Sequence, residues 1–306
     1  MKTLRMANWR PVLALVVLSA IWGYNWIMMK VAVKYAAPFD FAAIRTLLGA
    51  LSLFILIAVY KKIQRPDYIG QIALLGLLQT TGFFGFSMWA LQAGGAGKTA
   101  ALVYTMPFWV VVFAWPLLKE RVHGIQWPAV LLAFVGLMFI LEPWQMHSNV
   151  SSKLLAVMAG ISWALSVIVA KTLRQKTRLD LLSLTAWQML FGALPFLVIV
   201  ALTPSQPIHW QSSEFIVALF YNVIPANAVA WVLWLYILGR LPAGVASLGL
   251  LGAPVIGVLS AWIQLDEQPG IAELLGMACI ALGLLLLSVQ GWIRLKFHGE
   301  LAVDAK

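Results

Sequence analysis

One apolar stretch, Thr99–Arg121, constrains the fold more than any other part of the chain. It is long enough to cross a bilayer as a helix, which takes about 20 apolar residues. It contains Pro107, Trp115 and Glu120. The same residue types return with identical gaps at Pro254, Trp262 and Glu267. Because such a repeated spacing inside apolar helices is not expected by chance, it indicates a duplicated membrane unit.

The composition also indicates a membrane protein. Of the 306 residues, 62% are hydrophobic and only 10% are charged, whereas soluble domains carry about 25% charged residues. A net charge of +10 would suggest a nucleic-acid partner for a soluble chain, but here the basic residues lie in short loops between apolar runs. We therefore expect the lipid bilayer, and no nucleic acid, as a partner. The single cysteine, Cys279, can form neither a disulfide nor a Cys/His zinc site within the chain.

Ten apolar windows predict an all-α membrane protein with ten transmembrane helices. They cover residues 11–33, 39–60, 69–91, 98–118, 125–143, 153–173, 181–202, 214–236, 243–265 and 271–293. Helices are expected because open strands cannot satisfy their backbone groups in lipid. The first window follows three basic residues, as in a signal peptide, but no small-residue cleavage site ends it. We therefore expect a retained first span.

The second half of the chain repeats the first. The further matches are Trp22 and Lys30 with Trp163 and Lys171, Gly49-Ala50-Leu51 with Gly192-Ala193-Leu194, and Gly136 with Gly283. We predict two five-helix repeats, residues 11–143 and 153–293. Because five is odd, the second repeat must be inverted in the membrane. Inverted repeats with a site near the midplane are a recurring plan of secondary transporters.

The basic residues predict the orientation. Sixteen of the 21 lysines and arginines fall in the termini and loops of one face, and four fall on the other face, namely Lys30, Lys34, Lys98 and Lys153. Cytoplasmic loops carry an excess of Lys and Arg. We therefore expect a multi-pass protein of the bacterial cytoplasmic (inner) membrane with both termini in the cytoplasm.

These residues resemble the EamA family of the drug/metabolite transporter superfamily. The family's repeat is recognisable in Trp22-Gly23 with Arg45, in Gly97 to Pro107 and Lys119-Glu120-Arg121, and in Leu241-Pro242-Ala243-Gly244 to Pro254 and Glu267. Other stretches are similar to a cystine-exporting branch of the family, namely Phe39-Asp40-Phe41, Gly94–Lys98, Tyr104–Val111 and Asp180–Thr185. The resemblance covers nearly the whole chain. It implies ten helices, a cytoplasmic-membrane location and export of amino-acid-like metabolites.

The leading hypothesis is therefore a secondary transporter that exports small amino-acid-related metabolites, such as cystine or cysteine, by alternating access. Export of other amino acids (aromatic, or threonine and homoserine), of drugs or of purines, and uptake instead of export, remain open. We expect no cofactor and a monomer or homodimer. An embedded enzyme would need catalytic groups at depth, but all four histidines fall in loops or tails. A channel would normally show rings of charge, and an ATP-driven pump would need a phosphate-binding loop that the chain lacks.

Pro107 and Pro254 are candidate hinges. A mid-span proline removes a backbone hydrogen bond and clashes with the preceding turn, so it can either flex during transport or make a static kink. Glu120 and Glu267 end the matching spans on opposite faces and are candidate gate residues. Alternatively, they pair with neighbouring basic groups and only stabilise the turn.

Polar and aromatic side chains near the span centres are candidate substrate ligands. Gln79 and Thr80 lie in the third window, and Asn227 holds the repeat position of Thr80 in the eighth. Buried amides must find partners or line a wet cavity, so they either bind a zwitterionic substrate or hold helices together. The other candidates are Trp22, Tyr24, Asn25, Tyr104, Trp163 and Trp231, for which core packing is the competing interpretation.

Arg45 is a charge well inside a predicted span, about two turns from its periplasmic end. A cation there is costly. It either holds a substrate carboxylate, or it snorkels or pairs with a neighbour and sets helix packing. The middle third of every predicted span lacks Asp and Glu, so coupling through a midspan carboxylate is not supported.

Overall fold

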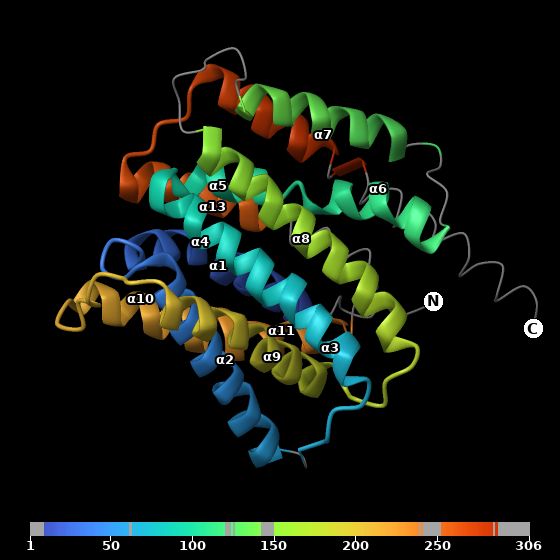
Figure 1. Cartoon of the computed structure of the whole chain (residues 1–306). Helices are drawn as coiled ribbons and strands as arrows, with labels where there is room; N and C mark the ends of the chain where they lie inside the picture. Colours follow the sequence, from blue (N-terminus) through green and yellow to red (C-terminus); the bar gives the residue numbers. More distant parts are fainter. Residues whose placement is uncertain are drawn as a thin grey trace, which may run out of the picture.

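The computed structural model describes residues 9–60, 63–119, 124, 126–141, 150–238, 240, 252–283 and 285–286. Within these ranges the regular structure is entirely helical, and the helices gather in one bundle (Figure 1). The sequence prediction of an all-α membrane protein is confirmed. Seven helices are long and apolar enough to cross a membrane.

Four of these seven are continuous helices, namely α1 (Trp9–Ala32), α2 (Pro38–Tyr60), α8 (Val150–Arg174) and α9 (Leu181–Leu202). Three further apolar helices are shorter, namely α7 (Gln126–Leu141), α13 (Gly252–Leu265) and the helix Ile271–Gly283. Each lies inside one of the ten predicted windows. Because these three fall short of a full span within the described residues, the count of ten spans stays a prediction.

Two of the long spans contain a π-helical segment at mid-length. The third span runs through α3 (Ile69–Gly76), η1 (Leu77–Gly82) and α4 (Phe83–Ala93). The other runs through α10 (Ser213–Val223), η2 (Ile224–Val229) and α11 (Ala230–Leu238). The two π segments start 147 residues apart, which is also the separation of Pro107 and Pro254. Short π segments inside α-helices are frequent at functional sites.

The fourth span is broken rather than kinked, which revises the expectation for Pro107. α5 (Ala96–Val103) ends at a turn, and α6 (Met106–Leu118) begins after it with Pro107 as its second residue. A proline costs little there because the first N–H groups of a helix have no partner in the helix. The turn is held by the Thr105 hydroxyl, which donates to the Leu102 carbonyl at 2.6 Å. Pro254 likewise lies near the start of α13, and residues 241–251 lie outside the described part.

The core lies between the two halves of the chain. The most extensive helix contacts all pair one half with the other, namely α2 with α9, α1 with α13, and α4 and α6 with α8; α2 lies beside α9 in Figure 1. Glycine allows the closest of these approaches. A Cβ at Gly23 would lie 2.6 Å from the Ala253 carbonyl oxygen, and one at Gly76 would lie 2.3 Å from that of Gln188. Small residues of this kind let membrane helices pack backbone against backbone.

Candidate functional site

The two π segments pack against equivalent glycines of the opposite half. In η1, Thr80 is fully buried and faces Gly192 of α9, where an added Cβ would lie 2.5 Å from the Thr80 Cβ. In η2, Asn227 is buried and faces Gly49 of α2, where an added Cβ would lie 2.3 Å from the Asn227 Nδ2. The sequence matched Thr80 with Asn227 and Gly49 with Gly192. In the structure, Thr80 of the first half packs on Gly192 of the second, and Asn227 of the second half packs on Gly49 of the first.

Carbonyls of both π segments accept side-chain hydrogen bonds from the opposite half. The Trp22 indole of α1 donates to the Ala226 carbonyl in η2 at 3.2 Å. The Ser162 hydroxyl of α8 donates to the Leu78 carbonyl in η1 at 2.8 Å. A π segment interrupts the regular α-helical bonding, and these donors satisfy carbonyls at the interruptions. α1 and α8 therefore play equivalent parts in the two halves.

The polar partners of the two segments differ. The Thr80 hydroxyl donates to the Gln188 Oε1 of α9 at 3.0 Å, so the η1 layer is satisfied. By repeat position the counterpart of Gln188 is Arg45, since each lies four residues before its matched glycine. In the η2 layer, the Asn227 Nδ2 and the Arg45 Nε and Nη1 have no hydrogen-bond partner within the described residues. The η1 layer therefore contains a donor paired with an acceptor, whereas the η2 layer contains donors that have no acceptor among the described residues.

Arg45 does not snorkel, so of the alternatives that the sequence left open, binding a substrate carboxylate and packing against a neighbour remain. Its side chain is only 1% exposed, and its guanidinium carbon lies 3.9 Å from the centre of the Phe84 ring of α4. A cation over an aromatic face is stabilised by about 0.5–2 kcal/mol. That does not replace the hydrogen bonds a buried guanidinium needs.

Two further buried oxygens have no hydrogen-bond partner in the described ranges, the Oδ1 atoms of Asn25 on α1 and Asn222 on α10. Asn222, like Asn227, flanks Pro225 at the centre of the eighth predicted window. Ring contact between Phe41 and Phe215 and the close approach of Gly49 to Asn227 put Arg45 and Asn222 at similar depth on α2 and α10. The Tyr221 hydroxyl donates to the Ile21 carbonyl, which places α1 at the same level. Sequence reasoning could have found this layer only by pairing α2 with α10.

The remaining aromatic candidates are spread over several places. Trp22 contacts Trp231 with ring centres 6.3 Å apart, so these two are brought together. The Tyr24 hydroxyl donates instead to the Gln264 Oε1 of α13 at 2.8 Å. Tyr104 lies at the α5–α6 break, 6.4 Å from the Trp26 ring.

Two candidates are partly buried near η1. Gln79 is part of η1 itself, and Trp163 directly follows Ser162, whose hydroxyl bonds η1. No contact in the described structure joins either of them to Trp22 or Asn227. Their role in substrate binding stays a prediction.

The gate candidate Glu267 makes a different contact from the one expected. It accepts hydrogen bonds from the backbone N–H groups of Ala96 at 2.8 Å and Gly97 at 3.0 Å, at the start of α5. It therefore binds backbone of the other half instead of a neighbouring basic side chain. Its sequence counterpart Glu120 lies outside the described residues.

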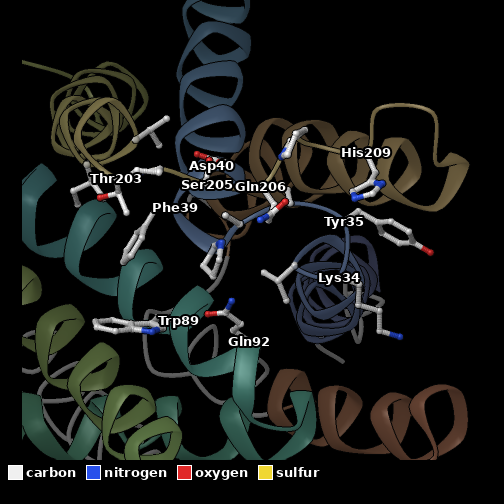
Figure 2. Close-up of a pocket in the computed structure, with 18 residues that line it drawn as sticks. Lys34, Tyr35, Phe39, Asp40, Trp89, Gln92, Thr203, Ser205, Gln206 and His209 are labelled. Carbon is white, nitrogen blue, oxygen red and sulfur yellow. The ribbon is translucent and has the colours of Figure 1, made fainter.

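A cavity of about 550 Å³ lies at the ends of α2, α4 and α9, away from this midspan layer. Figure 2 shows Phe39 and Asp40 of α2, Trp89 and Gln92 of α4, and the segment with Thr203, Ser205 and Gln206 around it. None of the side chains predicted to bind substrate lines it. At its rim the Tyr35 hydroxyl donates to Glu214, and this bond raises the pKa of Tyr35.

Comparison with known proteins decides the family. The model of the EamA-like transporter family matches residues 9–142 and again residues 151–289. The chain belongs to the EamA-like transporter family. It is a multi-pass membrane transporter with a small-molecule substrate, and no enzyme family is indicated.

Curated relatives match over most of their length. The chain is 29% identical to a probable amino-acid metabolite efflux pump of Escherichia coli (strain K12), over 89% of this chain and 92% of that protein. It is 27% identical to the uncharacterized transporter YoaV of Bacillus subtilis (strain 168), over 90% of this chain and 96% of that protein. A solved crystal structure, 17% identical, matches with a TM-score of 0.65 over 93% of this chain and 98% of that one, which supports the fold alone.

Proposed function

We propose that this EamA-family transporter exports small amino-acid-related metabolites across the cytoplasmic membrane by alternating access between its two halves. The relatives named as amino-acid metabolite efflux pumps support the substrate class. The interlocked π segments support a site at mid-depth, where secondary transporters bind substrate between repeats. Direction follows the relatives' names; uptake is the alternative outcome.

The observation that carries the proposal is the layer of unpaired donors around η2. The Arg45 Nε and Nη1 and the Asn227 Nδ2 are buried and have no acceptor in the part of the chain that the structure describes. A substrate carboxylate offers up to four lone-pair sites to such donors. The unpaired amide oxygens of Asn25 and Asn222 are acceptors for the substrate's ammonium group. A zwitterion thus supplies the charges and hydrogen bonds that this layer lacks, which favours amino acids over purines and drug cations.

In the proposed cycle, the halves rock about the break near Pro107 and about Pro254, and the gate residues Glu267 and Glu120 close opposite faces in turn. Trp22, Trp231 and Tyr24 wall the site on the α1 side, and Gln79, Tyr104 and Trp163 wall it on the η1 side, where Thr80 bonds Gln188 of the other half. Cystine and cysteine are the first substrates to test because of the stretches quoted above.

Counterflow in proteoliposomes tests this function. Vesicles are loaded with unlabelled cystine, cysteine, aromatic amino acids or threonine in turn, and entry of the labelled compound is followed. Saturable counterflow of one of them supports the proposal. Linear flux would indicate a pore, and counterflow of purines or drugs alone would overturn the substrate class.

Arg45→Gln tests the site itself. We expect the apparent Km for an amino acid to rise by about tenfold or more, the effect of losing one hydrogen bond to a charged group. The Km for the corresponding amino-acid amide, which lacks the carboxylate, should change little. An equal loss for both compounds, or loss of folded protein alone, would assign Arg45 to packing.

A further inference from the structure

The cavity at the ends of α2, α4 and α9 contains a buried carboxylate that lacks a partner. Asp40 lies in the first turn of α2, lines the cavity and is only 6% exposed. No hydrogen bond or ion pair joins its side chain to another of the described residues. Burying a charge is costly unless the charge is paired. The cavity is therefore suited to a ligand that brings a cation.

The nearby basic side chains do not supply that cation. Figure 2 shows the Lys34 amine pointing away from Asp40, although Lys34 belongs to the lining. His209 packs its ring against Tyr35, with 6.5 Å between the ring centres. Arg45, five residues further along α2, lies over the Phe84 ring. In the described part of the chain, no cationic side chain neutralises Asp40.

Two aromatic rings stand beside Asp40 in the lining. The Phe39 ring of α2 meets the Trp89 ring of α4 edge to face, with 5.9 Å between the ring centres. Phe39 is also held by Phe196 of α9, 6.4 Å away. Trp89 is 48% exposed, so part of its ring is free to contact a ligand. Aromatic faces attract cations and pack against apolar groups.

The oxygens of the lining fit an ammonium group better than a metal ion. Asp40 is the single carboxylate of the lining, and Gln92 and Gln206 add exposed amide oxygens. A calcium ion takes six to eight oxygen ligands, and no group of three or more metal-binding side chains occurs in the described ranges. A primary ammonium has three N–H donors, which one carboxylate and two amides can accept.

The cavity lies between the two halves of the chain, next to the lipid-facing surface. Its volume of about 550 Å³ is in the range of small-molecule sites. The first half supplies α2 and α4, and the second half supplies the end of α9 and the segment 203–209 (Figure 2). Beside the lining, α9 exposes Leu197, Val198 and Leu202. A ligand here touches both halves and is reachable from solution and from lipid headgroups.

We propose that this cavity is a second ligand site, which binds a primary ammonium group to Asp40 and the apolar part of the ligand to Phe39 and Trp89. The ammonium belongs to a small soluble amine or to the headgroup of phosphatidylethanolamine, and the chemistry of recognition is the same. The site is separate from the midspan layer proposed for the transported substrate. It does not depend on that proposal, because neither Asp40 nor Trp89 belongs to the layer.

Calorimetric titration of the full chain in detergent tests the site with benzylamine, which is an ammonium ion at neutral pH. We expect saturable binding to the parent and a Kd at least about tenfold higher for Asp40→Asn, the effect of losing one charge-assisted hydrogen bond. Benzyl alcohol has nearly the same shape without the charge, so it should bind at least about tenfold more weakly than benzylamine. Trp89→Leu should raise the Kd about two- to fivefold, as expected for an exposed cation–π contact.

Controls separate binding from folding and from other charges. A carboxylate in the first turn also favours α2 itself, so the unfolding temperature of Asp40→Asn without ligand is measured beside its Kd. If this variant does not fold, the benzyl alcohol comparison and Trp89→Leu still test the site. Glu273→Gln removes a carboxylate that is paired with Lys98 outside the lining, and it should leave the Kd unchanged.

Lipid nanodiscs distinguish the two sources of the ammonium group. Phosphatidylcholine has the same headgroup charge as phosphatidylethanolamine but no N–H donor. If the headgroup is the ligand, the parent should unfold at a higher temperature in discs with phosphatidylethanolamine, and Asp40→Asn should abolish this upward shift. If a soluble amine is the ligand, benzylamine binds and the two kinds of disc give equal unfolding temperatures.

Four outcomes would overturn the inference. These are benzylamine binding to Asp40→Asn as to the parent, equal binding of benzyl alcohol, and no effect of either benzylamine or phosphatidylethanolamine on the parent. The fourth is benzylamine binding that is lost in Arg45→Gln but kept in Asp40→Asn, which would assign the amine to the midspan layer. A failure of counterflow contradicts only the proposed function, since none of these measurements involves transport.

Discussion

The layers around η1 and η2 have the same backbone contacts, but their buried side chains differ in whether donors are matched by acceptors. Each π segment packs on a glycine of the other half, and each has a carbonyl bonded to a side chain from the other half. Around η1 the Thr80 donor meets the Gln188 acceptor. Around η2, the matched residues Asn227 and Arg45 present donors that have no partner among the described residues.

This difference in hydrogen bonding is our reason for proposing different roles for the two layers. A buried polar group without a partner costs free energy, about 1–3 kcal/mol for a neutral group and more for a charge. The η1 layer avoids that cost, whereas the η2 layer retains it until something supplies acceptors. We infer that the η1 layer holds the two halves together and that the η2 layer binds the substrate.

The strongest test of the difference between the two layers is to give the η2 layer the polar side chains of the η1 layer. The double variant Arg45→Gln with Asn227→Thr gives η2 a hydroxyl donor and an amide acceptor, as in η1. We expect a folded protein whose transport falls about 100-fold or more, since at least two hydrogen bonds to the substrate are lost. Counterflow and size-exclusion chromatography measure the two effects. Transport close to that of the parent would mean that the η2 layer does not bind substrate.

The glycines should differ in their cost to stability. Gly192→Ala would bring a Cβ within 2.4 Å of the Gly76 backbone oxygen, so two helices must separate. Gly49→Ala meets the movable end of the Asn227 side chain instead. Over-packing costs about 1–3 kcal/mol, and we expect Gly192→Ala at or above the upper end and Gly49→Ala near the lower end. Thermal unfolding in detergent checks this order, with Gly70→Ala as the control.

Single alanines should separate stability from transport. Thr80→Ala leaves the Gln188 Oε1 without its partner, so we expect a loss of about 1–3 kcal/mol in the free energy of unfolding. Asn227→Ala removes an amide nitrogen that has no partner, so it should cost less stability but lower transport. If Thr80→Ala lowered transport more than Asn227→Ala at equal amounts of folded protein, the assignment of the two layers would be reversed.

The smallest effects are expected at the carbonyl contacts. Trp22→Phe keeps most of the ring but removes the donor to Ala226, and Ser162→Ala removes the donor to Leu78. Each should cost about 0.5–1.5 kcal/mol of stability, the contribution of one neutral hydrogen bond. Equal shifts in unfolding temperature would support equivalent roles in the two halves. If only one variant lowered the unfolding temperature, the two halves would be equivalent in their backbone contacts but not in these side-chain hydrogen bonds.

Much of the fold could be predicted because each membrane helix is recognisable from its own run of apolar residues. The apolar windows located every described helix, and the spacing of Pro107 and Pro254 predicted the repeat. The break at Tyr104 and the π segments could not be predicted in the same way. They depend on hydrogen bonds such as those of Thr105 and Trp22, whose partners are set by the turn or by another helix.

The candidate site divides in the same manner. The sequence identified Arg45, Asn227 and Thr80 because polar groups in apolar helices stand out. It did not show that the Thr80 hydroxyl has a partner while the Arg45 Nε and Nη1 have none among the described residues, or that Glu267 binds the start of α5. The Gln188 partner lies 108 residues from Thr80, and the Ala96 partner lies 171 residues from Glu267.

By itself the sequence determined that the chain is an all-helical, duplicated membrane protein, because hydropathy and repeat spacing act over one helix at a time. Only the tertiary structure decided which buried polar groups find a hydrogen-bond partner among the described residues and which do not. The physical reason is that hydrogen bonding at depth is a pairwise property, and here the pairs form between halves that are far apart along the chain.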